Sequence, residues 1–211
     1  MFVTSINKLD KKKSLILLDE DIKISLYNSE LYKYGIREQT ELSEETSREI
    51  FEVLLPSRAR ERVFYMLKDS DKSEQDVRRK LLTAYYPEDI VEAVIRYMKD
   101  MKYIDDRRYA DNYIRGNRRQ KSINRMKQEL YFHGVEKSVI YEAVNSFEEE
   151  WDLLSEEQQR IIHKEFIRRK YDFRNEDEKL KNKIIQSLMR KGFNFDDIQS
   201  VYRKLKEESE T

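Results

Sequence analysis

The amino-acid sequence predicts a mainly α-helical fold: tandem three-helix repeats in an elongated array, preceded by a small N-terminal β/α unit. Three observations support this fold class. Only four glycines and two prolines interrupt the 211 residues, which favours helices over a fold rich in turns. Apolar residues recur every three or four positions from Ser57 onward, as they do on the buried face of a helix. One order of motifs also occurs three times in that part of the chain, which indicates a repeat architecture.

Composition limits the size of the core and the class of protein. Apolar residues make up 38% of the chain and charged residues 40%, so one thick shared core is not expected. Cysteine is absent, which excludes disulfides, thiolate nucleophiles and cysteine-based zinc sites. The longest apolar run is Leu15–Leu18, far too short for a membrane span or a signal-peptide core. We therefore expect a soluble cytoplasmic protein that does not contact a membrane.

Residues 1–55 predict a small mixed unit. Its strands are short segments with apolar residues at alternate positions or in a short run: Phe2–Ile6, Ser14–Leu18 and Ile22–Leu26. The acidic turn Asp19–Asp21 is expected to be a solvated hairpin tip rather than a metal site, because carboxylates diverge on a tight turn. Two helices should follow, the first closed by a glycine and the second stopped by a proline: Asn28–Tyr34 with Gly35, and Ser43–Leu55 with Pro56.

From residue 57 the chain repeats one plan of three helices. The middle helix of each copy has apolar residues four positions apart, at Val77/Leu81, Met126/Leu130 and Ile184/Leu188. A left-handed residue often ends such a helix, and four positions past the leucines stand Tyr85, Gly134 and Gly192. The predicted domains are the N-terminal unit at 1–55 and repeats at 57–104, 105–149 and 155–207. Repeats of this size are weakly stable alone and should be stabilised by contacts with neighbouring repeats.

Charge is balanced overall but unevenly distributed. Between Arg107 and Lys127, eight basic residues stand with Asp111 as the one acid, a local charge of +7, although the whole chain has zero net charge. Such a run is usually a solvated helix face; contact with phosphate or with an acidic protein surface is the competing interpretation. The candidate contact residues are Arg107, Arg108, Arg115, Arg118, Arg119, Lys121, Arg125 and Lys127, with Arg168, Arg169 and Lys170 in the third repeat.

No motif selects an enzyme. His133 stands at the end of a predicted helix and His163 on a charged one, so neither is expected to act as a base or a metal ligand. The sequence contains no glycine-rich phosphate loop, no nucleophile elbow and no metal-binding spacing of histidines and carboxylates. We therefore expect a non-enzymatic protein without cofactor or metal.

The segment Tyr103–Ile114, between the first two repeats, carries the most specific motif. It begins Tyr-Ile-Asp-Asp-Arg-Arg-Tyr-Ala. Asp105 suits the N-cap of a helix and Asp106 its first turn. A metal site or an acid/base pair is the alternative for these two carboxylates, although no third ligand lies nearby.

This motif resembles the opening of the second repeat in the RecX regulatory protein family. The further matching segments are Arg79–Leu81, Ile90–Met98, Gln128–Leu130 and His133–Val135. The resemblance spans about Ser57 to Phe147 well and the flanks more loosely. One departure is visible, because the family usually has a glycine near Ser122, where this chain has Lys121-Ser122.

The resemblance implies a bacterial, cytoplasmic regulator. RecX-like proteins bind the filament of the RecA recombinase on single-stranded DNA and suppress its ATP hydrolysis, coprotease and strand-exchange activities, within homologous recombination, DNA repair and the SOS response. The expected partner is therefore a RecA-type filament, with single- or double-stranded DNA as a further partner and the protein itself a monomer. A row of small modules would present a long surface suited to a filament groove.

Two other functions stay open from the residues alone. A sequence-independent DNA-binding helical-repeat protein is favoured by the basic run and disfavoured by the zero net charge. A structural scaffold for a different partner is the other. Affinity for bare single strands that falls steeply with salt would indicate the DNA-binding protein, whereas tighter binding to recombinase-coated strands would indicate the filament regulator.

Overall fold

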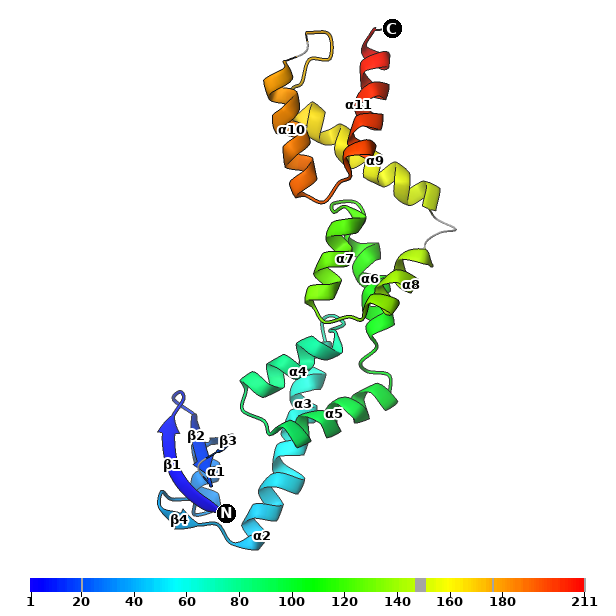
Figure 1. Cartoon of the computed structure of the whole chain (residues 1–211). Coiled ribbons are helices and arrows are strands. Elements are labelled where there is room, and N and C mark those ends of the chain that lie inside the picture. Colours follow the sequence, from blue (N-terminus) through cyan, green and yellow to red (C-terminus); the bar gives the residue numbers. More distant parts are fainter. Residues whose placement is uncertain (20, 147–150, 176, 211) are drawn as a thin grey trace. The chain divides into compact units, whose positions relative to one another are not determined.

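The computed structural model describes residues 1–19, 21–146, 151–175 and 177–210. The chain forms two compact units, Met1–Asp105 and Asp106–Thr211, and Figure 1 shows the elements of each. Helices dominate, and a small sheet precedes them, so the predicted fold class is confirmed. The finer division at 1–55, 57–104, 105–149 and 155–207 stays a prediction, because each compact unit combines two of these segments.

A small antiparallel sheet opens the first unit. Among the described residues it has four strands in the order β3-β2-β1-β4, namely β1 (Phe2–Lys8), β2 (Lys13–Leu18), β3 (Ile22–Tyr27) and β4 (Thr40–Glu41). The three predicted strands are confirmed; β4 was not predicted, because two residues leave no pattern. At the β2–β3 turn, Asp19 Oδ1 accepts a hydrogen bond from the backbone N–H of Phe2 at 2.7 Å. Glu20, the middle residue of the predicted tip, lies outside the described residues.

The helix predicted to stop at Pro56 instead continues through it, so that prediction was wrong. After the short helix α1 (Asn28–Lys33), closed by Gly35 at φ +61°, the chain forms three helical segments in direct succession. These are α2 (Glu44–Arg48), the π-helical η1 (Glu49–Leu54) and α3 (Leu55–Leu67). Ser43 does cap α2, because its Oγ accepts a hydrogen bond from Thr46 N at 3.1 Å.

The wide π-helical turn explains why the proline is tolerated. In a regular helix the proline ring clashes with the carbonyl four residues earlier. Pro56 instead occupies the first turn of α3, directly after η1, where the backbone is wider. Ile50 in η1 and Leu55 and Ala59 in α3 are buried, so burial of apolar surface favours one continuous element over a break.

The sheet and the first repeat share one core. The repeat consists of α3, α4 (Glu74–Thr83) and α5 (Glu88–Asp100). A single cluster of buried apolar residues runs from Val3 in β1 to Ile104 after α5. Ser25 Oγ in β3 also donates a hydrogen bond to the carbonyl oxygen of Ala84 after α4, at 3.0 Å. The N-terminal sheet is therefore stabilised by repeat 1.

The second unit holds two repeats with separate cores. Repeat 2 consists of α6 (Asp106–Asn117), α7 (Ile123–Phe132) and α8 (Lys137–Asn145), and repeat 3 of α9 (Trp151–Arg168), α10 (Glu178–Arg190) and α11 (Phe195–Glu210). One apolar cluster belongs to each. Helix α9 begins at Trp151, before residue 155, where the third repeat was predicted to start.

The three repeats end their middle helices in the same way. Tyr85, Gly134 and Gly192 follow α4, α7 and α10 with φ of +61°, +80° and +87°. This confirms the alignment of the three copies. In repeat 1 a tyrosine adopts the left-handed conformation that glycine takes at lower cost elsewhere.

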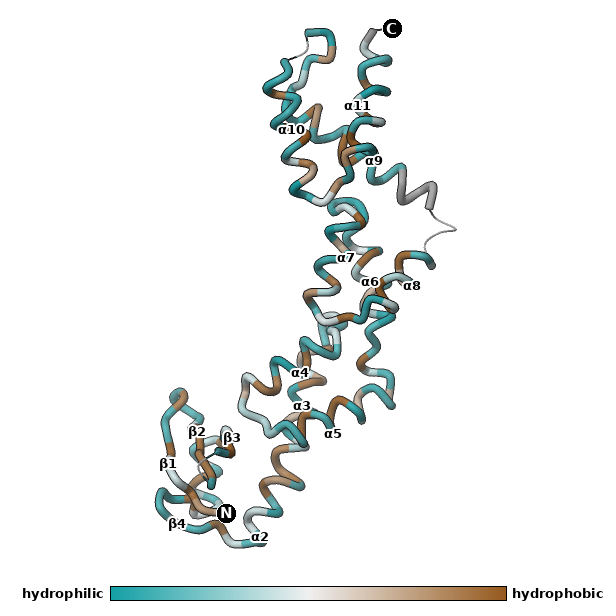
Figure 2. Tube along the Cα trace, viewed as in Figure 1, coloured by the Kyte–Doolittle hydropathy of each residue, from teal (hydrophilic) through white to brown (hydrophobic). Residues whose placement is uncertain are grey.

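Apolar residues are distributed along the chain in short intervals. Figure 2 shows them interspersed with hydrophilic residues along the helices rather than gathered in a long run. Accordingly, none of the helices in the described part of the chain combines the length and the apolar character needed to cross a bilayer.

Candidate interaction surface

All eleven candidate contact residues lie in the second compact unit. Arg107, Arg108 and Arg115 are on α6, Arg118, Arg119 and Lys121 between α6 and α7, Arg125 and Lys127 on α7, and Arg168, Arg169 and Lys170 at the end of α9 or just after it. Their neighbours in space include acids from elsewhere in the chain. The structure therefore divides most of them among several ion-pair clusters.

Glu157 gathers two of these arginines. The carboxylate is buried on α9, with Oε2 at 3.3 Å from Arg118 Nε and Oε1 at 3.3 Å from Arg119 Nε. The Arg118 side chain is mostly buried, whereas that of Arg119 is 80% exposed. The adjacent Gln158 donates a hydrogen bond from Nε2 to the carbonyl oxygen of Lys121 at 3.0 Å. The start of α9 in repeat 3 thus holds the α6–α7 connection of repeat 2.

A second set of polar contacts joins the same two repeats. Ser122 Oγ donates a hydrogen bond to the carbonyl oxygen of Lys191 at 2.8 Å, and Asn124 Nδ2 donates one to Asn194 Oδ1 at 2.9 Å. A Cβ on Gly192 would lie 2.6 Å from Ser122 Oγ and 3.1 Å from the backbone nitrogen of Arg125, so the start of α7 leaves no room for a side chain at this position. We call residues 118–125, 157–158 and 191–194 the inter-repeat joint.

Ser122 also lies where the resemblance described above leads us to expect a glycine. It is the N-cap of α7, with φ −71° and ψ 155°, and its Oγ accepts a hydrogen bond from Arg125 N at 3.1 Å. This extended conformation does not require glycine. The serine hydroxyl serves both α7, as an acceptor, and repeat 3, as a donor.

Glu129 on α7 is the centre of a second cluster. Its carboxylate lies 2.8 Å from Lys121 Nζ and 2.8 Å from Arg125 Nε, and it accepts a hydrogen bond from the Tyr113 hydroxyl. Burial raises the pKa of Glu129, but the hydrogen bonds from Lys121, Tyr113 and Arg125 outweigh it and lower the pKa to about 2. The carboxylate therefore stays ionised and holds both cations near the surface.

Glu165 on α9 organises a third cluster. It is buried, and its oxygens lie 2.6 Å from Arg168 Nη2, 3.3 Å from Arg169 Nε and 2.9 Å from Lys191 Nζ. Burial raises the pKa of Glu165. The hydrogen bonds and positive charges of Arg168, Lys191 and Arg169 outweigh this effect and lower the pKa to about 2. Three cations share one carboxylate here, so a net positive charge of two remains. At Glu129 and at Glu157 two cations share one carboxylate, so each of these clusters has a net positive charge of one.

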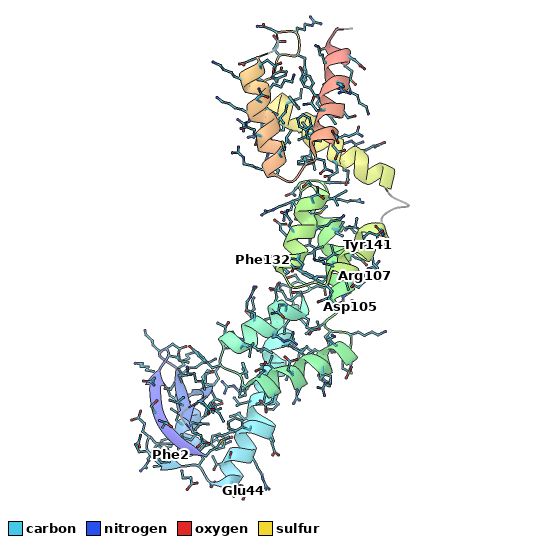
Figure 3. All side chains as sticks on the ribbon, viewed as in Figure 1. Phe2, Glu44, Asp105, Arg107, Phe132 and Tyr141 are labelled. Atoms are coloured by element: carbon cyan, nitrogen blue, oxygen red, sulfur yellow. The ribbon has the colours of Figure 1, made fainter. Side chains whose placement is uncertain are left out.

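The remaining candidate residues differ in their surroundings. Arg107 pairs with Asp111 at 3.1 Å and with Glu142 on α8 at 3.0 Å, and Figure 3 labels it with Asp105 near the start of α6. Arg108 and Arg115 also interact with other groups. Lys127 and Lys170 form no ion pair with another described residue.

The Asp105-Asp106 pair marks a helix start, because α6 begins at Asp106. Among the residues that the structure describes, no group of three histidine, cysteine, aspartate or glutamate side chains is placed to hold a metal ion. The metal alternative for this pair therefore has no geometric support within those residues.

The three glutamates were not singled out from the sequence. Glu129 follows Arg125 by four residues and Glu165 precedes Arg168 and Arg169 by three and four. Helical spacing could have found those pairs. Glu157 left no such signal, because it is 38 residues from Arg119.

Comparison with known proteins identifies the family. Residues 105–144 match the family model described as "RecX, second three-helix domain", and residues 148–202 match "RecX, third three-helix domain". Regulatory protein RecX of Streptococcus pneumoniae serotype 19F (strain G54) is 31% identical over 204 residues, which cover 95% of this chain and 76% of the relative. The chain belongs to the RecX family. The resemblance predicted from the Tyr103–Ile114 motif is thereby confirmed, and the chain has a RecX regulatory role.

Other RecX proteins agree with this assignment. Regulatory protein RecX of Clostridioides difficile (strain 630) is 28% identical over 192 residues, 90% of this chain and 88% of the relative. A crystal structure of regulatory protein RecX superposes with a TM-score of 0.61 at 25% identity, covering 95% of this chain and 98% of that one. The structure of RecX from Lactobacillus salivarius shares the fold, with a TM-score of 0.60, 24% identity and coverage of 72% and 96%.

Proposed function

We propose that this RecX protein binds the RecA recombinase filament on single-stranded DNA and inhibits its ATPase and strand-exchange activities. The observation that carries the proposal is the family membership, which extends over 95% of the chain. The relatives are named regulatory proteins, which favours binding rather than catalysis as the mode of action.

The ion-pair clusters of the second unit support a binding role. Glu129, Glu157 and Glu165 each fix two or three cations in place and neutralise one charge. Cations that are already positioned lose less conformational freedom when they meet a partner. Each cluster keeps a positive charge, which would speed encounter with the negatively charged filament and help to set the register of binding.

The test is RecA ATP hydrolysis on circular single-stranded DNA, with increasing amounts of this protein. We expect hydrolysis to fall by about tenfold or more at far fewer protein molecules than nucleotides, because one molecule bound to a filament affects many protomers. Doubling the DNA at fixed RecA should leave the inhibition intact, which excludes competition for bare strands. Unchanged hydrolysis at saturating protein would overturn the proposal.

The second candidate function, direct DNA binding, is favoured by the Glu165 cluster. Its two net positive charges lie on exposed side chains, and each cation that contacts a phosphate adds about 0.7 to the salt slope for single strands. If these arginines contact DNA, Arg168→Gln with Arg169→Gln should flatten the slope of log affinity against log salt by up to about 1.4. Lys191 still pairs with Glu165 in this variant.

A matched control removes two charges elsewhere in repeat 3. Lys179→Gln with Lys183→Gln acts on exposed lysines of α10 and should leave the slope for a fluorescent oligo(dT) almost unchanged. Equal slopes for both double variants would show that the Glu165 cluster makes no specific phosphate contact.

A further inference from the structure

A groove between α7 and α8 belongs to none of the clusters above. Its volume is about 340 Å³, and it is lined by Lys127, Gln128 and Tyr131 from α7 and by Lys137, Ile140 and Tyr141 from α8. On each helix the lining includes positions three and four residues apart, which lie on one helix face. Figure 3 labels Tyr141 on α8. The groove lies entirely within repeat 2.

The lining is apolar and includes two exposed aromatic side chains. Ile140 is buried, whereas Tyr131 and Tyr141 are 61% and 64% exposed. Lys137 Nζ lies 5.6 Å from the centre of the Tyr131 ring. The apolar cluster of repeat 2 includes Ile140 but neither tyrosine. Exposed tyrosines around an apolar surface are typical of the central contacts of protein interfaces.

We infer that this groove is a contact site for a protein partner, whose bound segment carries a large apolar side chain flanked by carboxylates. This inference rests on the proposed function, in which the recombinase filament supplies the segment. The apolar side chain would pack on Ile140 between the two tyrosine rings and remove apolar surface from water. The ammonium groups of Lys127 and Lys137 would pair with the flanking carboxylates.

The charges near the groove favour a protein segment over a nucleic-acid strand. Successive phosphates need a continuous track of cations, but here acids stand beside the lining residues. The exposed Glu136 precedes Lys137, and the exposed Glu142 follows Tyr141. Glu142 also already pairs with Arg107. The groove offers one ammonium group from each helix, Lys127 and Lys137, and this pair fits a short peptide segment with acidic and apolar residues better than it fits a run of phosphates.

The decisive variant is Tyr131→Ser with Tyr141→Ser. Both side chains are exposed, so the fold should persist, and a thermal unfolding curve checks this. We expect binding to RecA filaments on poly(dT), measured by anisotropy of the labelled protein, to weaken about tenfold or more, since two aromatic contacts are lost. Binding to bare poly(dT) should not change. Tyr32→Ser with Tyr65→Ser is the matched control, because these tyrosines are 91% and 79% exposed in the first unit.

The charge part of the inference has its own test. Lys127→Glu with Lys137→Glu should weaken filament binding more at low salt than at high salt, because exposed ion pairs are screened. If the tyrosine variant binds filaments as tightly as the wild-type protein does, and the wild-type protein inhibits RecA, the groove inference is overturned while the proposed function stands. A parallel loss of binding to bare poly(dT) would assign the groove to nucleic acid instead. Wild-type protein that neither binds nor inhibits filaments would overturn the proposed function as well.

Discussion

Replacing Glu165 by glutamine should destabilise the second compact unit at neutral pH and reduce its sensitivity to acid. The buried carboxylate binds Arg168, Arg169 and Lys191, and its pKa lies at about 2 instead of the ordinary 4.5. A difference of this size corresponds to roughly 3 kcal/mol as an upper limit. Glutamine keeps the shape of the side chain but removes the charge that the three cations require.

The direction of the pH effect follows from the lowered pKa. An acid with a lowered pKa in the folded state contributes its full stability above the unfolded value, near 4.5, and loses it as the pH falls toward 2. The free energy of unfolding of the wild-type second unit should therefore decline as the pH falls from about 4.5 toward 2. About half of the decline should remain in Glu165→Gln, because the pKa of Glu129 is also about 2.

Urea unfolding at pH 7 and at several lower pH values measures both effects. The matched control is Glu178→Gln in the same repeat, whose carboxylate is 63% exposed and pairs with Lys181 at 3.2 Å. A helical i,i+3 pair whose carboxylate is exposed to solvent contributes about 0.5 kcal/mol or less. A Glu165→Gln protein that unfolds at the wild-type urea concentration at pH 7 would contradict the assigned role of the buried carboxylate.

Gly192→Ala should open or shift the inter-repeat joint. Gly192 has φ +87°, which costs an alanine about 1 kcal/mol. The new Cβ would also lie 2.6 Å from Ser122 Oγ and 3.1 Å from the backbone nitrogen of Arg125, and crowding of this kind adds about 1–2 kcal/mol. The total expected loss of stability in the second unit is about 2–3 kcal/mol.

Two other glycines separate the two causes. Gly35 has φ +61° but open space around its Cβ position, so Gly35→Ala should cost only the backbone term of about 1 kcal/mol. Gly116, within α6, has open space and no left-handed φ, so Gly116→Ala should stabilise the helix by about 0.5–1 kcal/mol. Hydrogen exchange measured by mass spectrometry reports each unit separately. If Gly192→Ala and Gly35→Ala lowered the free energy of unfolding of their units by the same amount, the close contact at the inter-repeat joint would make no contribution to stability.

Several elements could be predicted because their causes are local. The alternation of Ile22, Ile24 and Leu26 in β3, the cap at Ser43 and the left-handed residues after α4, α7 and α10 each depend on residues a few positions apart. The exception was Pro56, where a local rule for ending helices gave way to the burial of Ile50, Leu55 and Ala59 along one face. A π-helical turn directly before Pro56 accommodates the proline within a continuous helical element, and no residue pattern indicated this turn in advance.

By itself, the sequence determined that the chain is built of helical repeats, that Tyr103–Ile114 begins the second of them, and that basic residues concentrate from Arg107 to Lys127 and again at Arg168–Lys170. Only the tertiary structure decided what those basic residues do, because electrostatic pairing depends on distance in space. Arg118 and Arg119 form part of a joint with Glu157, Lys121 and Arg125 share Glu129, and Arg168 and Arg169 share Glu165. The groove between α7 and α8 likewise exists only because helix packing places Tyr131 and Tyr141 around Ile140.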